Sequence, residues 1–337
     1  MRTSERHMQY RIPALIGMLV VVAVATLAGQ TSSSPAQPRT AKGWTPPRTA
    51  DGHPDFQGVW TFSTLTPLER PAEFTGKAFL TDEEAKQFEE RTMQRNNRDN
   101  RDRSSPEADV GGAYNEFWFN RGVRAARVNG KTPTSLIVDP PDGKIPALTP
   151  EGQKRAAARA DARREHPADG PEDRSLGERC LLFSAGPPML SGPYNNYVQL
   201  FQTRDHVVIF NEMIHDARIV PLDGRPHLAP GIRALLGDSR GRWEGDTLVV
   251  ETTNFTDKTT VRGSGERLRL VERFTRADAG TLLYEFTVDD PASFTKPWTA
   301  VIPMAKTADQ IFEYACHEAN YAMTGILRGA RSGEKRP

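Results

Sequence analysis

The sequence predicts a mainly β protein in which an antiparallel meander closes into a barrel or a tight sandwich. Two observations predict it. Residues 197–203 and 206–212 have the pattern of a β-hairpin across a short polar turn. In the last third of the 337-residue chain, short strand-like runs then follow one another with turn signals between them: 242–252, 268–275, 281–288, 298–304 and 311–316.

The N-terminus has the organisation of a signal peptide. Arg2, Arg6 and Arg11 form a basic region, and an apolar run over 14–27 follows it, so that we predict cleavage after Ala28. The apolar run is shorter than the roughly 20 residues of a membrane-spanning helix. A retained N-terminal anchor is the alternative. The expected location is the periplasm or the exterior, with no membrane contact after cleavage.

The charge balance gives no indication of a polyanionic partner. The chain carries 44 Lys and Arg against 43 Asp and Glu, a net charge of +1. Removal of residues 1–28 deletes three arginines and one glutamate, a net +2, and leaves 1 − 2 = −1. Such a chain lacks the positive field that binds nucleic acid or an anionic membrane. Neither is an expected partner, and the oligomeric state stays open.

The N-terminal half predicts a lead-in and a mixed α/β segment. Residues 29–55 are rich in Ser, Pro, Thr and Gly and are expected to be flexible. The segment 56–192 is expected to pack on the β domain and to begin with a strand over 59–62. A further strand over 135–139 ends at the turn sequence Pro-Pro-Asp-Gly.

Two helices are predicted in this segment. The first covers about 81–95, where Thr81 is the cap residue and Glu84, three residues later, completes a capping box. The second covers about 149–165 and has Pro150 at its first helical position. Its body is rich in Ala and Arg without an apolar stripe, which predicts a surface helix.

The β domain is predicted over 193–325, and a disordered tail over 326–337. Within the domain, a strand over 218–222 follows the hairpin. The polar run 238–242 is expected to be an ordinary turn because acidic residues flank its arginines.

Alternation within the meander places one acidic residue among apolar ones. Along 268–274 the even-numbered residues are apolar except Glu272. If 277–280 form a hairpin turn, Glu272 lies on the interior face opposite Tyr284. A buried carboxylate needs a partner, or its pKa rises.

The two cysteines, Cys180 and Cys316, predict one disulfide in an exported protein. Two unpaired buried thiols are the alternative. No second Cys or His lies near either residue at the spacing of a metal site, so no metal is predicted.

Five longer motifs stand out in the sequence: Gly-His-Pro-Asp-Phe-Gln-Gly-Val-Trp at 52–60, the segments 135–143 and 223–226, Arg-Trp-Glu-Gly-Asp-Thr-Leu-Val-Val-Glu-Thr at 242–252, and 312–316. Together they resemble those of a large family of exported bacterial proteins. The resemblance covers nearly the whole mature chain and implies export, but it supplies no activity, cofactor or catalytic residue. In addition, Gly58-Val59-Trp60 resembles the Gly-x-Trp entry of lipocalin barrels, which implies a lipocalin-like plan for the β domain.

One acid–base constellation can be assembled from the polar residues. His215 and the adjacent Asp216 follow the predicted hairpin, and a His beside an acid can act as a general base, with Glu272 as the acid. Tyr284 or Arg218 would orient these groups. The alternative is a static polar network that ties a loop to the barrel mouth. The histidines have no metal-ligand spacing, so no metal or other cofactor is expected.

Aromatic residues predict the leading function. Trp118, Tyr197, Tyr284 and Trp298 are candidate ligand-binding residues of an apolar cavity, since small barrels often enclose one. Plain core packing is the alternative. The first hypothesis is an exported protein that binds a small apolar or aromatic molecule. The others are a hydratase, isomerase or hydrolase that uses the acid–base constellation, and a structural envelope protein.

Overall fold

The computed structural model describes residues 43–100, 104–106, 115–183, 186–259, 261–318 and 320–334. The predicted signal peptide and residues 29–42 of the lead-in lie outside these residues. No helix within the described ranges is long and apolar enough to cross a membrane.

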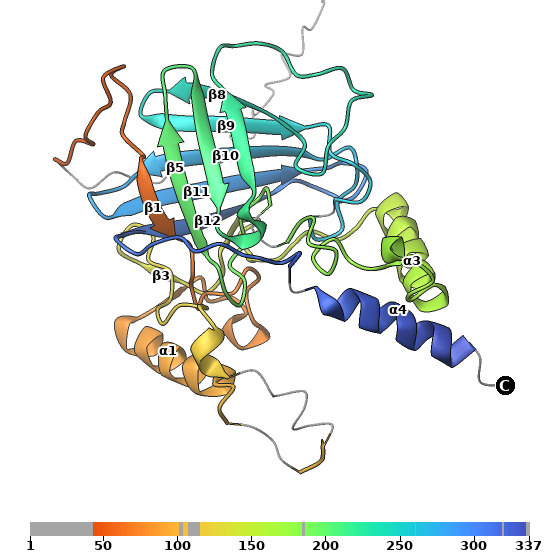
Figure 1. The fold of residues 1–337 in the computed structure, drawn as a ribbon. Helices are drawn as coiled ribbons and strands as arrows, with labels where there is room; N and C mark the ends of the chain where they lie inside the picture. Colours follow the sequence, from red (N-terminus) through yellow and green to blue (C-terminus); the bar gives the residue numbers. More distant parts are fainter. Residues whose placement is uncertain are drawn as a thin grey trace, which may run out of the picture. The chain divides into compact units, whose positions relative to one another are not determined.

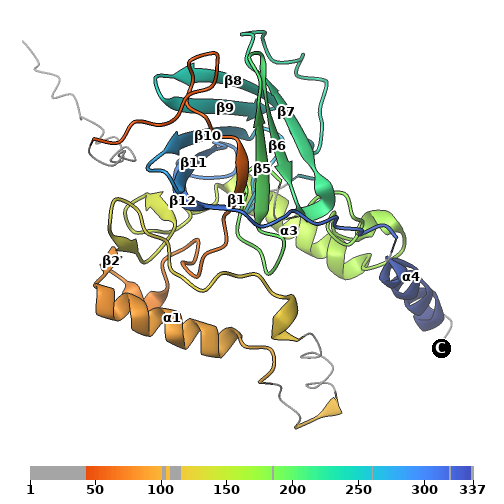
Figure 2. The same ribbon diagram turned by 60° about the vertical axis from the view of Figure 1, so that its left-hand side comes forward.

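The fold is mainly β, built on one large antiparallel sheet (Figures 1 and 2). The strand order is β7-β6-β5-β1-β12-β11-β10-β9-β8, and β4 pairs with β12. β1 and β4 belong to the segment that was expected to pack on the β domain, so the two parts share this sheet. The strands are β1 (Gly58–Thr61), β4 (Ile137–Asp139), β5 (Tyr197–Gln202), β6 (His206–Asn211), β7 (Ala217–Pro221), β8 (Asp238–Glu244), β9 (Thr247–Thr253), β10 (Arg269–Arg276), β11 (Thr281–Asp289) and β12 (Trp298–Thr307). β2 (Phe79–Leu80) and β3 (Thr132–Pro133) form a separate small sheet.

The β10–β11 hairpin differs from the prediction by two residues. The N–H of Ala277 donates to the carbonyl of Thr281 at 3.0 Å, which leaves a turn of 278–280 instead of 277–280. Glu272 is therefore opposite Phe286, not Tyr284. Because side chains alternate with a period of two, a shift of two keeps Glu272 on the interior face.

The two edge strands of the sheet, β7 and β8, come into contact at Gly241. A Cβ atom on Gly241 would lie 2.6 Å from Leu222 Cδ2 and 2.9 Å from Val220 Cγ1, so a larger residue would push these side chains aside. No backbone ladder joins β7 to β8 among the residues that the structure describes. The sheet thus curls until its edges touch, without the hydrogen bonds of a closed barrel.

Two predictions within the β domain were wrong. Residues 238–242, expected to be a turn, begin β8, where the hydroxyl of Ser239 is buried and lies 2.8 Å from that of Thr252 on β9. Paired hydroxyls satisfy each other, which lets a polar sequence form a strand. Residues 311–316 form no strand and lead irregularly from β12 to the disulfide, with Phe312 68% exposed.

The two predicted helices are present. In α1 (Asp82–Asn96) the capping box of Thr81 and Glu84 is formed, and the helix packs Phe88 into a small apolar cluster beside the main core. α3 (Pro150–Glu165) is capped by the hydroxyl of Thr149. Short 3₁₀ turns occupy Ala72–Phe74, Glu116–Trp118, Pro171–Asp173 and Met213–His215.

The C-terminal segment is a helix, α4 (Tyr321–Glu334), where a disordered tail was expected from residue 326. Its half-buried residues are Met323, Ile326, Leu327 and Ala330, which share one face of a helix. Three glycines within the segment obscure this period in the sequence.

Residues 43–55, expected to be part of a flexible lead-in, are fixed against the β8–β9 turn. Arg48 Nη2 lies 2.8 Å from Asp246 Oδ1, and the ring of His53 stacks on Trp243 at 4.6 Å between centroids. Two of the motifs that carry the family resemblance therefore contact each other.

Candidate functional site

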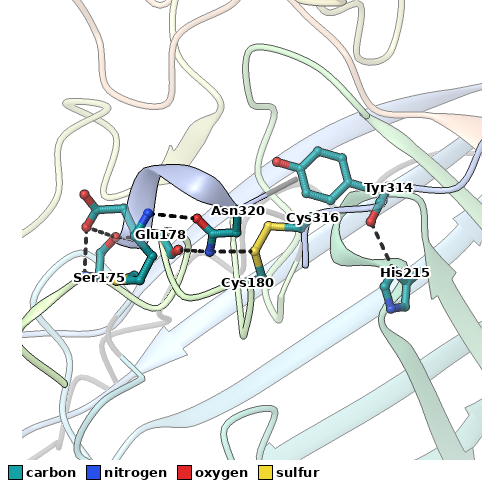
Figure 3. The surroundings of a disulfide bond; sticks show 8 residues. Ser175, Glu178, Cys180, His215, Tyr314, Cys316 and Asn320 are labelled. Carbon is teal, nitrogen blue, oxygen red and sulfur yellow. Dashed lines mark hydrogen bonds between the residues drawn. A yellow bond between two sulfur atoms is a disulfide. The ribbon is translucent and has the colours of Figure 1, made fainter. Parts of the chain in front are cut away.

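The predicted disulfide is present between Cys180 and Cys316, whose Cα atoms lie 5.7 Å apart (Figure 3). Asn320 Nδ2 donates to the carbonyl of Glu178 at 2.8 Å and approaches Cys180 Sγ at 3.4 Å. The bond joins the irregular segment 174–183 to the chain that follows β12. It therefore holds that segment in place from 136 residues away.

Glu272 lies in a closed polar network inside the sheet. Its carboxylate pairs through both oxygens with the guanidinium of Arg218 on β7, with Nη2–Oε1 at 2.8 Å. The hydroxyl of Tyr284 donates to Oε1 at 2.7 Å and accepts the N–H of Met189 at 3.0 Å. Burial, together with the charge of Glu272, holds the pKa of Tyr284 well above its usual range. Glu272 is completely buried, so this network has the character of a static core element.

His215 and Asp216 lie elsewhere, in the turn between β6 and β7. The imidazole of His215 is exposed, and its Nδ1 lies 3.3 Å from the carbonyl oxygen of Tyr314 (Figure 3). Asp216 is half-buried, and burial raises the pKa of its carboxyl to about 6. The structure brings His215 and Asp216 together but does not bring Glu272 to them.

The backbone of this turn is strained. Ile214 has φ +61° and His215 has φ +47°, a left-handed conformation that is an outlier for a β-branched residue. Such strain persists only where the surrounding structure imposes it and is often found at functional sites.

The four predicted ligand-binding aromatics do not share a cavity. Tyr284 and Trp298 are completely buried in the main core, where both contact the ring of Phe286. Trp118 is 59% exposed, and Tyr197 is half-buried with its hydroxyl 3.2 Å from Asp309 Oδ2. Core packing therefore accounts for Tyr284 and Trp298.

The structure places a different concave site beside α3. A pocket of about 790 Å³ lies between α3, the segment 172–191 and the loop 257–262. This volume is in the range of small-molecule sites. The disulfide at Cys180 holds one of its walls.

The pocket is basic although the whole chain is nearly neutral. Six permanently cationic side chains and three carboxylates line it, a local balance of 6 − 3 = +3. His166 also lines the pocket, and a hydrogen bond to Asp169 raises its pKa, which favours its cationic form. The cationic residues are Arg159, Arg163, Arg174, Arg179, Lys258 and Arg262, and the acidic ones are Glu172, Asp173 and Asp257.

Four of these cations have no protein acceptor among the described residues, and three of them, Arg163, Lys258 and Arg262, are exposed to solvent. Within the part of the chain that the structure describes, the side chains of Arg163, Arg179, Lys258 and Arg262 form no ion pair or hydrogen bond. Arg159 donates to two backbone carbonyls, among them that of Asp257 at 2.7 Å. Burial and neighbouring arginines lower the pKa of Arg159, as expected where positive charges gather.

The remaining lining of the pocket is apolar. It includes side chains on both sides of the disulfide-bonded Cys180, and Phe183 is 40% exposed. Convergent cations beside an apolar wall match a molecule with an anionic head and an apolar body. The apolar residues are Ala162, Leu176, Leu182, Phe183, Pro187, Pro188, Leu190 and Val261.

This pocket is not predicted by the sequence pattern. The sequence does contain one indication of a basic surface here. Along α3 an arginine recurs every four residues, at Arg155, Arg159 and Arg163, so these side chains share one face of the helix. The lack of an apolar stripe led to the interpretation of a plain surface helix. The other walls come from distant irregular segments, which have no periodic pattern.

No group of three or more His, Cys, Asp or Glu residues in the described ranges could hold a metal ion. Comparison of the chain with protein-family models, with curated proteins and with solved structures gave no match. The resemblance to a family of exported bacterial proteins therefore stays a prediction.

Proposed function

We propose that this protein binds a small organic anion with an apolar body, and that it does so in the pocket beside α3. The observation that carries the proposal is the set of four cations without acceptors, Arg163, Arg179, Lys258 and Arg262, around a partly apolar pocket. The proposal keeps the expected role of a small-molecule binding protein but moves the ligand out of the sheet. The curled sheet, lipocalin-like in plan, is then the scaffold.

Electrostatics favours an anion over a neutral ligand. Six cations against three carboxylates leave an excess of positive charge in the pocket, and a carboxylate or sulfonate relieves the resulting repulsion. Guanidinium groups also form paired hydrogen bonds with such oxyanions. An apolar tail would cover the exposed ring of Phe183, and each methylene buried contributes about 0.8 kcal/mol.

The proposal includes export to the periplasm or the exterior, which the signal-like N-terminus and the disulfide support. Cell fractionation of the full-length protein, with N-terminal sequencing of the product, tests it. Cleavage after Ala28 is the expected result.

Isothermal titration of the mature protein with octanoate tests the binding, and octanamide serves as the uncharged counterpart. Octanoate should bind and octanamide should bind at least about tenfold more weakly, with octanoate affinity falling as salt increases. The double variant Arg163→Gln/Arg262→Gln should weaken octanoate binding by at least about tenfold.

Arg95→Gln on α1 is the matched control, because it removes an exposed arginine outside the pocket and should leave binding unchanged. Equal binding of octanoate and octanamide would contradict the proposal. So would octanoate affinity that is the same in the double variant and the wild type.

A further inference from the structure

The positive charge of the pocket beside α3 is concentrated at one corner, where the helix meets the loop 257–262. Arg159 joins the two, since its guanidinium donates to the carbonyl of Asp257 at 2.7 Å. Arg163 follows one turn later on the same face of α3. Burial and the charges of Arg155 and Arg163 lower the pKa of Arg159. Cations of the helix and of the loop therefore lie close together at this place, the α3 corner.

The α3 corner carries the whole excess charge of the pocket. Four cationic side chains and one carboxylate line it, a balance of 4 − 1 = +3, and His166 at the end of α3 adds to it when protonated. The wall 172–179 is neutral by the same count, with two cations and two carboxylates, 2 − 2 = 0. One of these cations, Arg174, is also paired with Glu178. The corner consists of Arg159, Arg163, Lys258, Arg262 and Asp257, and the wall contributes Arg174, Arg179, Glu172 and Asp173.

The apolar side chains of the pocket are distributed the opposite way. Six of the eight lie between residues 176 and 190, and only Ala162 and Val261 belong to the helix and the loop of the α3 corner. The pocket is therefore polarised. An amphiphilic anion fits it with its head at the α3 corner and its apolar body against Phe183 and the neighbouring apolar residues.

We propose that the ligand of this pocket has a compact, doubly charged head, such as that of a phosphate monoester, which binds at the α3 corner. This inference rests on the proposed anion binding and specifies its ligand. A monoanionic head compensates only one of the three excess charges, whereas a phosphate monoester carries a charge of about −1.5 to −2 near neutral pH.

The oxygens of such a head also match the donors of the α3 corner. A phosphate monoester offers three strong acceptor oxygens, which guanidinium and ammonium groups bind through charge-assisted hydrogen bonds. Arg163, Lys258 and Arg262 have no protein acceptor among the described residues, so their donors are available to one head at the same time.

Titration of the mature protein with octyl phosphate and octyl sulfate tests the charge of the head. The two compounds have the same tail and a tetrahedral head, but at about pH 8 the phosphate is dianionic and the sulfate is monoanionic. Octyl phosphate should bind at least about tenfold more tightly than octyl sulfate, because the second charge interacts with several cations.

The double variant Lys258→Gln/Arg262→Gln tests the place of the head. It removes two exposed cations of the α3 corner and should reduce the ratio of the two affinities by at least about threefold. Arg267→Gln is the matched control, because it removes an exposed arginine that does not line the pocket, and it should keep the wild-type ratio.

The outcomes separate this inference from the proposed function. Equal affinities for octyl phosphate and octyl sulfate, with octanoate still bound, would overturn the doubly charged head and leave anion binding in place. Binding of none of the three compounds would overturn both. A preference for phosphate that Lys258→Gln/Arg262→Gln leaves unchanged would overturn the assignment of the head to the α3 corner.

Discussion

At the scale of single residues, the ion pair between Arg218 and Glu272 shows how the interior tolerates charge. Each partner is buried, and each depends on the other for compensation. Glu272→Gln should lower the free energy of unfolding by about 3–5 kcal/mol, because it leaves the guanidinium without a counterion. Urea denaturation measures the loss.

The paired variant Arg218→Met/Glu272→Leu is the control for this prediction. It removes both charges and should recover most of the stability, since a buried ion pair is often replaceable by apolar side chains. A Glu272→Gln protein as stable as the wild type would mean that water reaches Arg218.

The carboxyl of Asp216 should make stability depend on pH. Burial raises its pKa from 3.8 to about 6, so the folded protein binds this proton more tightly than the unfolded chain does. Its stabilising contribution is complete below pH 3.8 and is lost as the pH rises to about 6. Asp216→Asn should therefore gain stability relative to the wild type across this window.

Thermal unfolding of both proteins at a series of pH values checks this prediction. The difference between their melting temperatures should grow with pH through the window and level off above it. A difference that stays constant with pH would show that the carboxyl of Asp216 is solvated.

At the scale of elements, the position of α3 depends on Gly152. A Cβ atom there would lie 2.5 Å from the carbonyl oxygen of Ser293, a backbone atom that cannot move aside freely. Gly152→Ala should displace α3, lower the free energy of unfolding by about 1–3 kcal/mol, and weaken octanoate binding, because Arg159 and Arg163 lie on this helix. Urea denaturation and titration measure both effects.

Gly325→Ala on α4 is the matched control. Nothing lies within 4 Å of the position of its Cβ, so alanine should be tolerated and should favour the helix by up to about 1 kcal/mol. Octanoate affinity unchanged in Gly152→Ala would contradict the assignment of α3 as a wall of the site.

At the scale of the whole molecule, the disulfide between Cys180 and Cys316 should contribute to stability and to the pocket. Its 136-residue separation predicts at most about 4–5 kcal/mol from restriction of the unfolded chain. The variant Cys180→Ser/Cys316→Ser should be less stable by up to this amount, and its segment 174–183 should be cleaved faster by proteases.

Reductant provides the control for this measurement. It should destabilise the wild type and leave the double variant unchanged. Equal stability of the two oxidised proteins would mean that the native packing alone holds the segment.

Local signals determined much of the fold. The capping box at Thr81 and the cap at Thr149 place two helices correctly, because a helix start depends on a few neighbouring residues. Alternation placed Glu272 on the interior face, and it does so whichever register is formed. The cysteine pair followed from composition and the expected compartment.

The same local signals failed where partners distant in sequence decide the outcome. Residues 238–242 form a strand because β9 offers a partner for Ser239, whereas residues 311–316 form no strand. The register of the β10–β11 hairpin depended on the length of one turn.

The sequence by itself thus determined the mainly β class, the two capped helices and the disulfide, all of which follow from composition and short-range pattern. The tertiary structure decided which charged groups meet. Arg218 reaches Glu272, 54 residues away, because the sheet curls. The pocket gathers Arg163, Arg179 and Lys258 from three separate segments. Residues that meet across the folded protein have no characteristic spacing in the sequence, because the fold of the intervening chain brings them together.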